Sequence, residues 1–226
     1  MANASWLAPA CGILFPILFI VAMTLEPQDP PEGTDDAAWA DYYLDAGVGG
    51  RAGFYVEGVA WLLFVVFLGG LGARLAEREA DRTWSRTATG AGLLIVALGL
   101  VSFVGRWVLV WEDTHQDAPS RTFALFASNL HNAAFTFQFT LFVLLAGAAG
   151  ASMLATRSFP RWLGWTSVVF AAENLLHSLE GIWVEAPWVG VLHNVGFLMF
   201  LLWPILVGGT WLAGLRPRAE APPAVA

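Results

Sequence analysis

Charge, lysine and cysteine are all scarce in this sequence, and each shortage excludes a class of protein. Only 13% of the 226 residues are charged, about half the share of a soluble domain. Lysine is absent, so all eleven basic residues are arginines, and we find no basic groove that would bind nucleic acid. The single cysteine, Cys11, excludes an internal disulfide framework and a cysteine-based metal site.

Apolar residues dominate instead. They make up 57% of the chain, and the mean hydropathy is +0.61. Such a chain has too little polar surface to cover itself in water, which predicts a lipid bilayer as its main partner. Six stretches are long and apolar enough to cross a bilayer, at roughly 6–25, 53–75, 90–111, 123–151, 162–184 and 188–213. We therefore predict an all-α, polytopic membrane protein built as a six-transmembrane-helix bundle.

Arginine placement predicts the orientation of the bundle, because cytoplasmic loops carry an excess of basic residues. The arginine-rich segments are the second loop, the fourth loop and the C-terminal tail, with Arg74, Arg78, Arg82, Arg86, Arg157, Arg161, Arg216 and Arg218. In a six-helix protein all three segments fall on one side. The sequence therefore predicts cytoplasmic N- and C-termini in a bacterial plasma membrane.

The remaining segments are assigned by composition. Residues 1–215 are predicted to form a single transmembrane bundle domain, and residues 216–226 a disordered cytoplasmic tail. The first outer loop is acidic, and its Trp39, Tyr42 and Tyr43 share one helical face. This pattern predicts a short amphipathic helix between Asp35 and Asp45 that rests on the outer membrane surface. A lid over an external site is the alternative.

Four segments carry a resemblance to a known group of proteins. They are Ala38–Tyr43 (AWADYY), Leu68–Leu75 (LGGLGARL), Phe159–Trp165 (FPRWLGW) and Gly196–Trp203 (GFLMFLLW). Together with the helix pattern, they resemble uncharacterised six-helix bacterial integral membrane proteins, a domain-of-unknown-function family. The resemblance implies a membrane location and the helix count, and it carries over no activity and no catalytic residue.

Polar side chains inside the predicted spans are costly and point to function. The predicted orientation places almost all of them in the outer half of the bundle, which indicates a polar chamber that opens outward above an apolar plug. On helix 162–184, Glu173, His177 and Glu180 are spaced i, i+4 and i+7 and form one stripe. His131 and His193 lie at compatible depths on neighbouring helices.

These residues define the predicted site. His131, Glu173, His177, Glu180 and His193 would bind a divalent transition metal, zinc or iron, or another small ligand. Four asparagine side chains would form hydrogen bonds with these metal-binding side chains on the side away from the metal: Asn129, Asn132, Asn174 and Asn194. Glu57 and Arg106 would form an ion pair at the rim. Haem held by His131 with His193 or His177 is an alternative occupant.

Three functions fit this pattern. The first is a metal- or ligand-binding membrane protein without turnover. The second is an accessory or structural subunit of a membrane complex, or a homo-oligomer, in which the polar residues hold helices together. The third is a metal-dependent membrane enzyme with Glu173 or Glu180 as general base. The sequence contains no serine-hydrolase elbow, Walker loop, dinucleotide fingerprint or HExxH motif, so no reaction is assigned.

Overall fold

The computed structural model describes residues 6–26, 47–112, 121–178 and 189–215. Within these ranges the secondary structure is all α-helical, as predicted, and contains no strand. Each of the helices in the described ranges overlaps one predicted span: α1 (Leu7–Leu25), α3 (Gly47–Ala76), α4 (Thr83–Glu112), α5 (Arg121–Thr156), α6 (Arg161–Ser178) and α7 (Val189–Leu215).

Five of the described helices are long and apolar enough to cross a membrane, namely α1, α3, α4, α5 and α7. Their length and composition indicate a multi-pass membrane protein. Over its 18 described residues, α6 is not among the five, because Arg161, Glu173, Asn174 and His177 lower its apolarity. The prediction of six spans is thus supported for five helices, and the end of the remaining predicted span, 162–184, lies outside the described residues.

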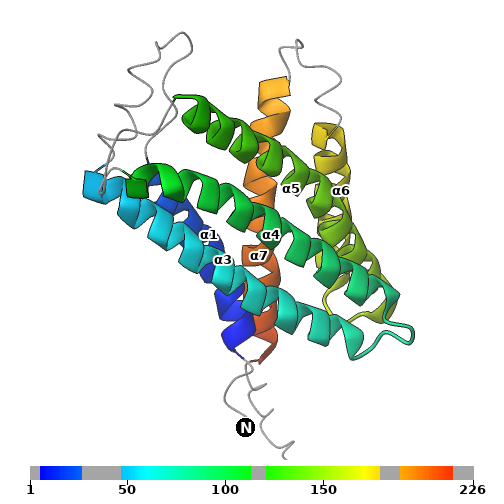
Figure 1. Ribbon diagram of the computed structural model, residues 1–226. Coiled ribbons are helices and arrows are strands. Elements are labelled where there is room, and N and C mark those ends of the chain that lie inside the picture. Colours follow the sequence, from blue (N-terminus) through cyan, green and yellow to red (C-terminus); the bar gives the residue numbers. More distant parts are fainter. Residues whose placement is uncertain (1–5, 27–46, 113–120, 179–188, 216–226) are drawn as a thin grey trace, which may run out of the picture.

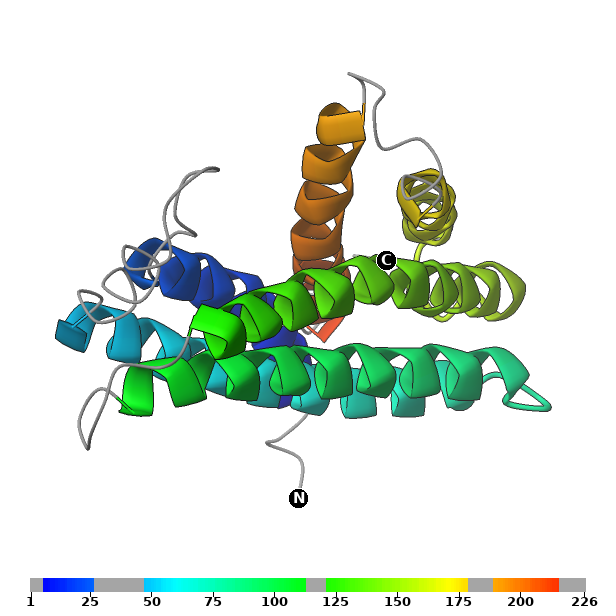
Figure 2. The ribbon, with the colours of Figure 1, turned by 45° about the horizontal axis from the view of Figure 1, so that its top comes forward.

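The helices form a closed ring in chain order. Each helix packs on the next, and α7 packs on α1 to close the ring. α3, α4 and α5 run nearly aligned, whereas α7 crosses them at a steep angle (Figures 1 and 2). Pro16 and Pro204 lie inside α1 and α7, where packing against neighbouring helices can compensate for the interrupted backbone hydrogen bonding.

One end of the bundle, which we call the arginine end, carries the start of α1, the α3–α4 turn, the α5–α6 connection and the end of α7 (Figure 1). The Arg74 guanidinium lies 5.9 Å from the ring centroids of both Phe159 and Trp211. Arg78 Nη1 donates a hydrogen bond to Arg157 O at 3.2 Å. These contacts join α3, the α5–α6 connection and α7, and they bring the two described arginine-rich segments together.

Carboxylates fix the start of α4 after a short turn. Glu79 Oε1 accepts a hydrogen bond from Trp84 N at 2.6 Å, and Glu79 Oε2 accepts one from Ser85 N at 2.9 Å. Asp81 Oδ1 accepts a hydrogen bond from Thr83 N at 3.1 Å. The first N–H groups of a helix lack intrahelical acceptors, so these side chains determine where α4 begins.

The helices extend beyond the predicted spans at the arginine end. α3 continues to Ala76 and α4 begins at Thr83, so Arg86, which was predicted in the second loop, lies in a helix, and Arg74 lies in the last turn of α3. Apolarity marks the bilayer, whereas a helix in water continues until a cap or turn ends it. The predicted amphipathic helix between residues 35 and 45 and the predicted tail 216–226 lie outside the described residues.

Aromatic rings fill the centre of the helix ring. The Phe15 side chain of α1 is fully buried. It stacks on Phe64 of α3 at a centroid distance of 4.3 Å and meets Phe200 of α7 edge-on at 5.8 Å. Phe142 of α5 lies edge-on to Phe200 at 5.4 Å and to Trp203 at 5.7 Å. This core leaves the polar side chains to the seams between neighbouring helices.

Candidate functional site

Three polar side chains of α6 lie inside the bundle. Asn174 has no exposed surface, His177 is 1% exposed, and Glu173 is half-buried. Twelve residues separate Glu173 from Arg161 at the start of the helix, a rise of about 18 Å at 1.5 Å per residue. Glu173 therefore lies well away from the arginine end of the bundle, where α6 begins.

The side-chain oxygens of Glu173 and Asn174 converge on Gly196 of α7. A Cβ atom built on Gly196 would lie 3.4 Å from Glu173 Oε2, 3.5 Å from Asn174 Oδ1 and 3.6 Å from Glu173 Oε1. Asn174 Nδ2 donates hydrogen bonds to Phe170 O at 2.9 Å and to Glu173 Oε2 at 3.1 Å. Glu173 Oε1 and Asn174 Oδ1 are buried and accept no hydrogen bond from the described residues.

These two oxygens give the site its chemistry. A buried acceptor without a donor costs free energy on the order of 1–3 kcal/mol. Two such acceptors beside one glycine can bind a cation, a protonated group or a hydrogen-bond donor. Within the described part of the chain, no arginine forms an ion pair with Glu173. We refer to Glu173, Asn174, His177 and Gly196 as the α6–α7 site.

Aromatic rings of α5 cover the same face of α6. The His177 ring lies edge-on to Phe139, with centroids 4.3 Å apart. Phe139 meets Phe135 edge-on at 4.8 Å, and Phe135 stacks on His131 at 6.1 Å. His131 Nδ1 forms a hydrogen bond with Ser102 Oγ of α4. His177 is thus packed against α5, and His131 ties α5 to α4.

His131 of α5 and His177 of α6 lie at different levels along the axis of α5. His131 and Phe139, the ring that covers His177, are eight residues apart, a rise of about 12 Å. Two nitrogens on one metal ion must each lie about 2 Å from it, so His131 and His177 do not share an ion in this arrangement. Among the described residues no group of three or more histidine, cysteine, aspartate or glutamate side chains is placed to bind a metal.

The other predicted site residues are placed as follows. Asn129, Asn132 and Asn194 are exposed, and Asn174 lies at the α6–α7 site. Glu180 lies outside the described residues, and His193 belongs to α7 but its side chain is not described. The predicted metal centre as a whole therefore stays a prediction.

The predicted rim ion pair is placed only in part. Glu57 is 7% exposed and accepts a hydrogen bond from Trp61 Nε1 at 3.0 Å. Arg106 lies in α4, but its side chain is outside the described part of the chain, so the pair also stays a prediction. Glu57 and Trp61 are four residues apart on one helix, and this spacing could have indicated their hydrogen bond.

Several other polar side chains connect neighbouring helices. Gln138 Nε2 of α5 donates a hydrogen bond to Ile95 O of α4 at 3.2 Å. Thr140 Oγ1 of α5 donates to Ser178 Oγ of α6 at 3.1 Å. Trp203 Nε1 of α7 donates to Ser167 Oγ of α6 at 2.9 Å. The bonds of Gln138 and Trp203 are buried and that of Thr140 is exposed; all three join neighbouring helices, as expected of residues that hold membrane helices together.

Two residues were not predicted from the sequence: Gly196, which shapes the α6–α7 site, and Ser102, the hydrogen-bond partner of His131. The only signals were a glycine and a serine inside otherwise apolar helices. Gly196 matters because it lacks a side chain opposite Glu173, and the sequence does not show which residues face each other across a seam. No family model, curated protein or solved structure matches the chain, so the family resemblance inferred from the sequence stays a prediction.

Proposed function

We propose that this multi-pass membrane protein binds a small cation at the α6–α7 site, either a metal ion or the ammonium group of a small molecule. One observation carries the proposal: Glu173 Oε1 and Asn174 Oδ1 are buried beside Gly196 and accept no hydrogen bond from the described residues. Both atoms are acceptors, so a bound cation or a donor would satisfy them together.

The position of Glu173 supports this function. An ionisable side chain within a bilayer is costly, by a contested ~2.5 kcal/mol or more, and is a functional candidate by default. The Glu173 carboxyl group has no arginine partner in the described residues, so a bound cation would stabilise its charged form. The amide oxygen of Asn174 adds a second, neutral oxygen ligand.

The membrane orientation belongs to the same proposal. Basic residues favour the cytoplasmic side, so we place the arginine end and both termini in the cytoplasm of a bacterial plasma membrane. The α6–α7 site then opens to the outside, beneath the proposed amphipathic helix of residues 35–45. This arrangement agrees with the proposed kinship to the uncharacterised six-helix bacterial membrane proteins.

The kind of cation depends on residues beyond the described site. A zinc or iron ion would require His193 and Glu180 in addition to Glu173 and His177, since such ions prefer several nitrogen and carboxylate ligands. Haem would require His193 as one of its two histidines, because Phe135 and Phe139 lie between His131 and His177. An ammonium group requires only the oxygens of Glu173 and Asn174.

Ligand-dependent thermal stabilisation tests the proposal. The purified protein in detergent micelles is analysed for bound zinc, iron and haem, and its unfolding temperature is measured with Zn²⁺, Na⁺ and methylammonium. We expect that the purified protein carries zinc, iron or haem, or that at least one of the three added cations raises its unfolding temperature. The effect should disappear in Glu173→Gln, which removes the charge, and in Gly196→Leu, which fills the space beside it.

Gly209 provides a matched control in the same helix, because a Cβ atom there would meet nothing within 4 Å. Gly209→Leu should respond to the cation as the unmodified protein does. If no metal or haem is bound and none of the three cations changes the unfolding temperature, the proposal is wrong. It is equally wrong if Glu173→Gln responds to the cation like the unmodified protein.

A structural subunit is the second candidate. The hydrogen bonds from Gln138, Thr140 and Trp203 to neighbouring helices favour it, because they account for those polar residues without a ligand. In that case neither the unmodified protein nor Glu173→Gln would respond to any of the three cations. The protein would purify with other membrane subunits or as a homo-oligomer.

A further inference from the structure

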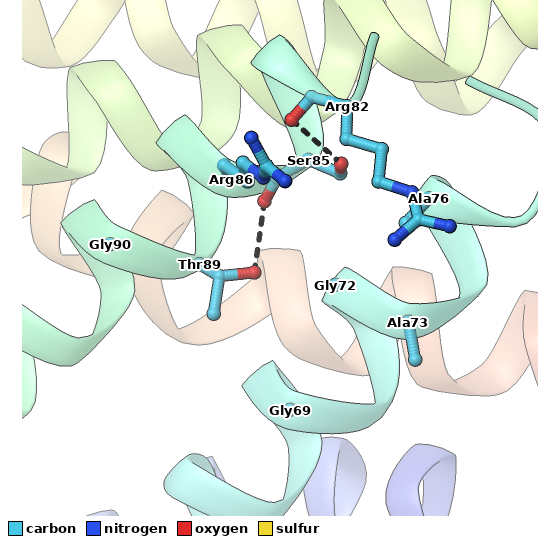
Figure 3. Close-up of a pocket in the computed structure, with 9 residues that line it drawn as sticks. All are labelled: Gly69, Gly72, Ala73, Ala76, Arg82, Ser85, Arg86, Thr89 and Gly90. Atoms are coloured by element: carbon cyan, nitrogen blue, oxygen red, sulfur yellow. Dashed lines mark hydrogen bonds between the residues drawn. The ribbon is translucent and has the colours of Figure 1, made fainter. Parts of the chain in front are cut away.

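The groove between α3 and α4 at the arginine end combines two arginines with a floor of small residues. It is open, has a volume of about 360 Å³, and is lined by Gly69, Gly72, Ala73, Ala76, Arg82, Ser85, Arg86, Thr89 and Gly90. Figure 3 shows both arginine side chains above the two helices. The volume lies within the range of about 300–1,000 Å³ that is usual for small-molecule sites.

Most charged groups around this groove are already engaged. Arg78 donates to Arg157 O, and the Glu79 carboxylate accepts hydrogen bonds from α4 and from Ser152 Oγ, the latter at 3.2 Å. Asp81 accepts a hydrogen bond from the start of α4. The backbone N–H groups at this helix terminus are therefore occupied and do not form the site.

Arg82 and Arg86 differ from these groups. Among the described residues, neither guanidinium donates a hydrogen bond or lies within ion-pair distance of a carboxylate. The charge of Arg86 contributes to the lowered pKa of Asp81, but less than the hydrogen bonds from Thr83 do. The two free guanidiniums lie at one groove and share no protein anion.

The depth of the groove indicates what kind of molecule fits. Its lining on α3 runs from Ala76 to Gly69, a distance of about 10 Å along the helix axis, and it passes from the charged turn into the apolar span. Cβ atoms built on Gly69 and Gly90 would meet nothing within 4 Å, so the floor is open. A charged head at the arginines and an apolar chain along the glycines would match this gradient.

We infer that this groove binds the phosphate group of an anionic phospholipid, with the guanidiniums of Arg82 and Arg86 on the phosphate and an acyl chain along the Gly69 and Gly90 face. Guanidinium groups suit phosphate because their N–H donors match its oxygens. Basic pockets between transmembrane helices bind such headgroups in general. This site is independent of the α6–α7 site, and either can fail without the other.

Lipid titration of the full chain tests the inference. The protein in detergent micelles is titrated with phosphatidylglycerol, with phosphatidylcholine and with inorganic phosphate, and the unfolding temperature is followed. Phosphatidylglycerol should raise it with a saturable midpoint. Arg82→Gln and Arg86→Gln should each weaken that midpoint about fivefold, and Gly90→Leu should weaken it without changing charge.

Two variants are matched controls at the same end of the bundle. Arg161→Gln removes an exposed arginine that does not line the groove, and Gly214→Leu adds a side chain where a Cβ atom meets nothing within 4 Å. Both should bind phosphatidylglycerol like the unmodified protein. Equal weakening by Arg161→Gln and Arg86→Gln would show only diffuse attraction and would overturn the inference. Equal stabilisation by phosphatidylcholine, or by inorganic phosphate, would overturn the anionic lipid as occupant.

Discussion

Glu79 makes the clearest energetic prediction, because one carboxylate accepts three hydrogen bonds that join two parts of the bundle. Its oxygens accept from Trp84 N, Ser85 N and Ser152 Oγ at 2.6, 2.9 and 3.2 Å. The first two bonds begin α4, and the third connects the α3–α4 turn to α5. Glu79→Ala removes all three at once.

The expected loss follows from the environment of the carboxylate. A hydrogen bond to a charged group is worth about 1.5–3 kcal/mol when water cannot replace it. The α3–α4 turn is partly exposed, so water will satisfy the released N–H groups in part, and replacing a helix cap costs about 0.5–2 kcal/mol. We therefore expect Glu79→Ala to lower the free energy of unfolding by about 2–3 kcal/mol. Glu79→Gln keeps one acceptor oxygen and should cost less.

The assay is reversible unfolding by sodium dodecyl sulfate in mixed micelles, followed by tryptophan fluorescence. Glu77→Ala is the matched control, since Glu77 lies only two residues away and contacts Arg74 Nη1 at 3.8 Å on the surface. Such an exposed pair contributes about 0–1 kcal/mol. If Glu79→Ala and Glu77→Ala destabilise the protein equally, Glu79 does not determine the start of α4 and the reasoning is refuted.

Two further predictions concern the core and the pH dependence of stability. Phe15→Ala should lower the free energy of unfolding by about 3–5 kcal/mol, since it leaves a cavity in the aromatic core; Leu14→Ala, at a side chain 46% exposed, should cost much less in the same micelle assay, and equal losses would contradict the proposed core. Hydrogen bonds from Thr83 lower the pKa of Asp81 below its ordinary value of 3.8, so the stabilisation by Asp81 is present above that value and is lost as the pH falls through the lowered pKa. Unfolding temperatures measured at decreasing pH should show a smaller acid-induced drop in Asp81→Asn, and an unchanged drop would argue against this role.

The sequence predicts the helices well and the helix ends poorly, for a physical reason. Runs of apolar residues are set by the thickness of the bilayer, so every described helix overlaps a predicted span. The ends depend on hydrogen bonds that apolarity does not report. Glu79 and Asp81 begin α4 well before the apolar run, which is why Arg86 was assigned to a loop although it lies in a helix.

The candidate site was predictable in its chemistry but not in its contacts. The spacing of Glu173 and His177 predicted one stripe on α6, where Glu173 is half-buried and His177 is buried. The same spacing could not show that Phe135 and Phe139 keep His131 away from His177, because that depends on how α5 is rotated against α6. The closeness of Gly196 to Glu173 likewise depends on the register between α6 and α7. A single sequence does not indicate that register.

The seam between α6 and α7 is where a cation could bind with the smallest loss of packing. Within the described residues α6 contacts α5 extensively and α7 much less, and α7 presents a glycine opposite Glu173. The aromatic core fills the centre of the bundle. Gly196→Ala would place its Cβ atom at ordinary contact distance, 3.4–3.6 Å from the two side chains, whereas Gly196→Leu would occupy the space a cation needs. The alanine variant should therefore weaken binding less than the leucine variant, and the reverse order would show that the seam is not the binding space.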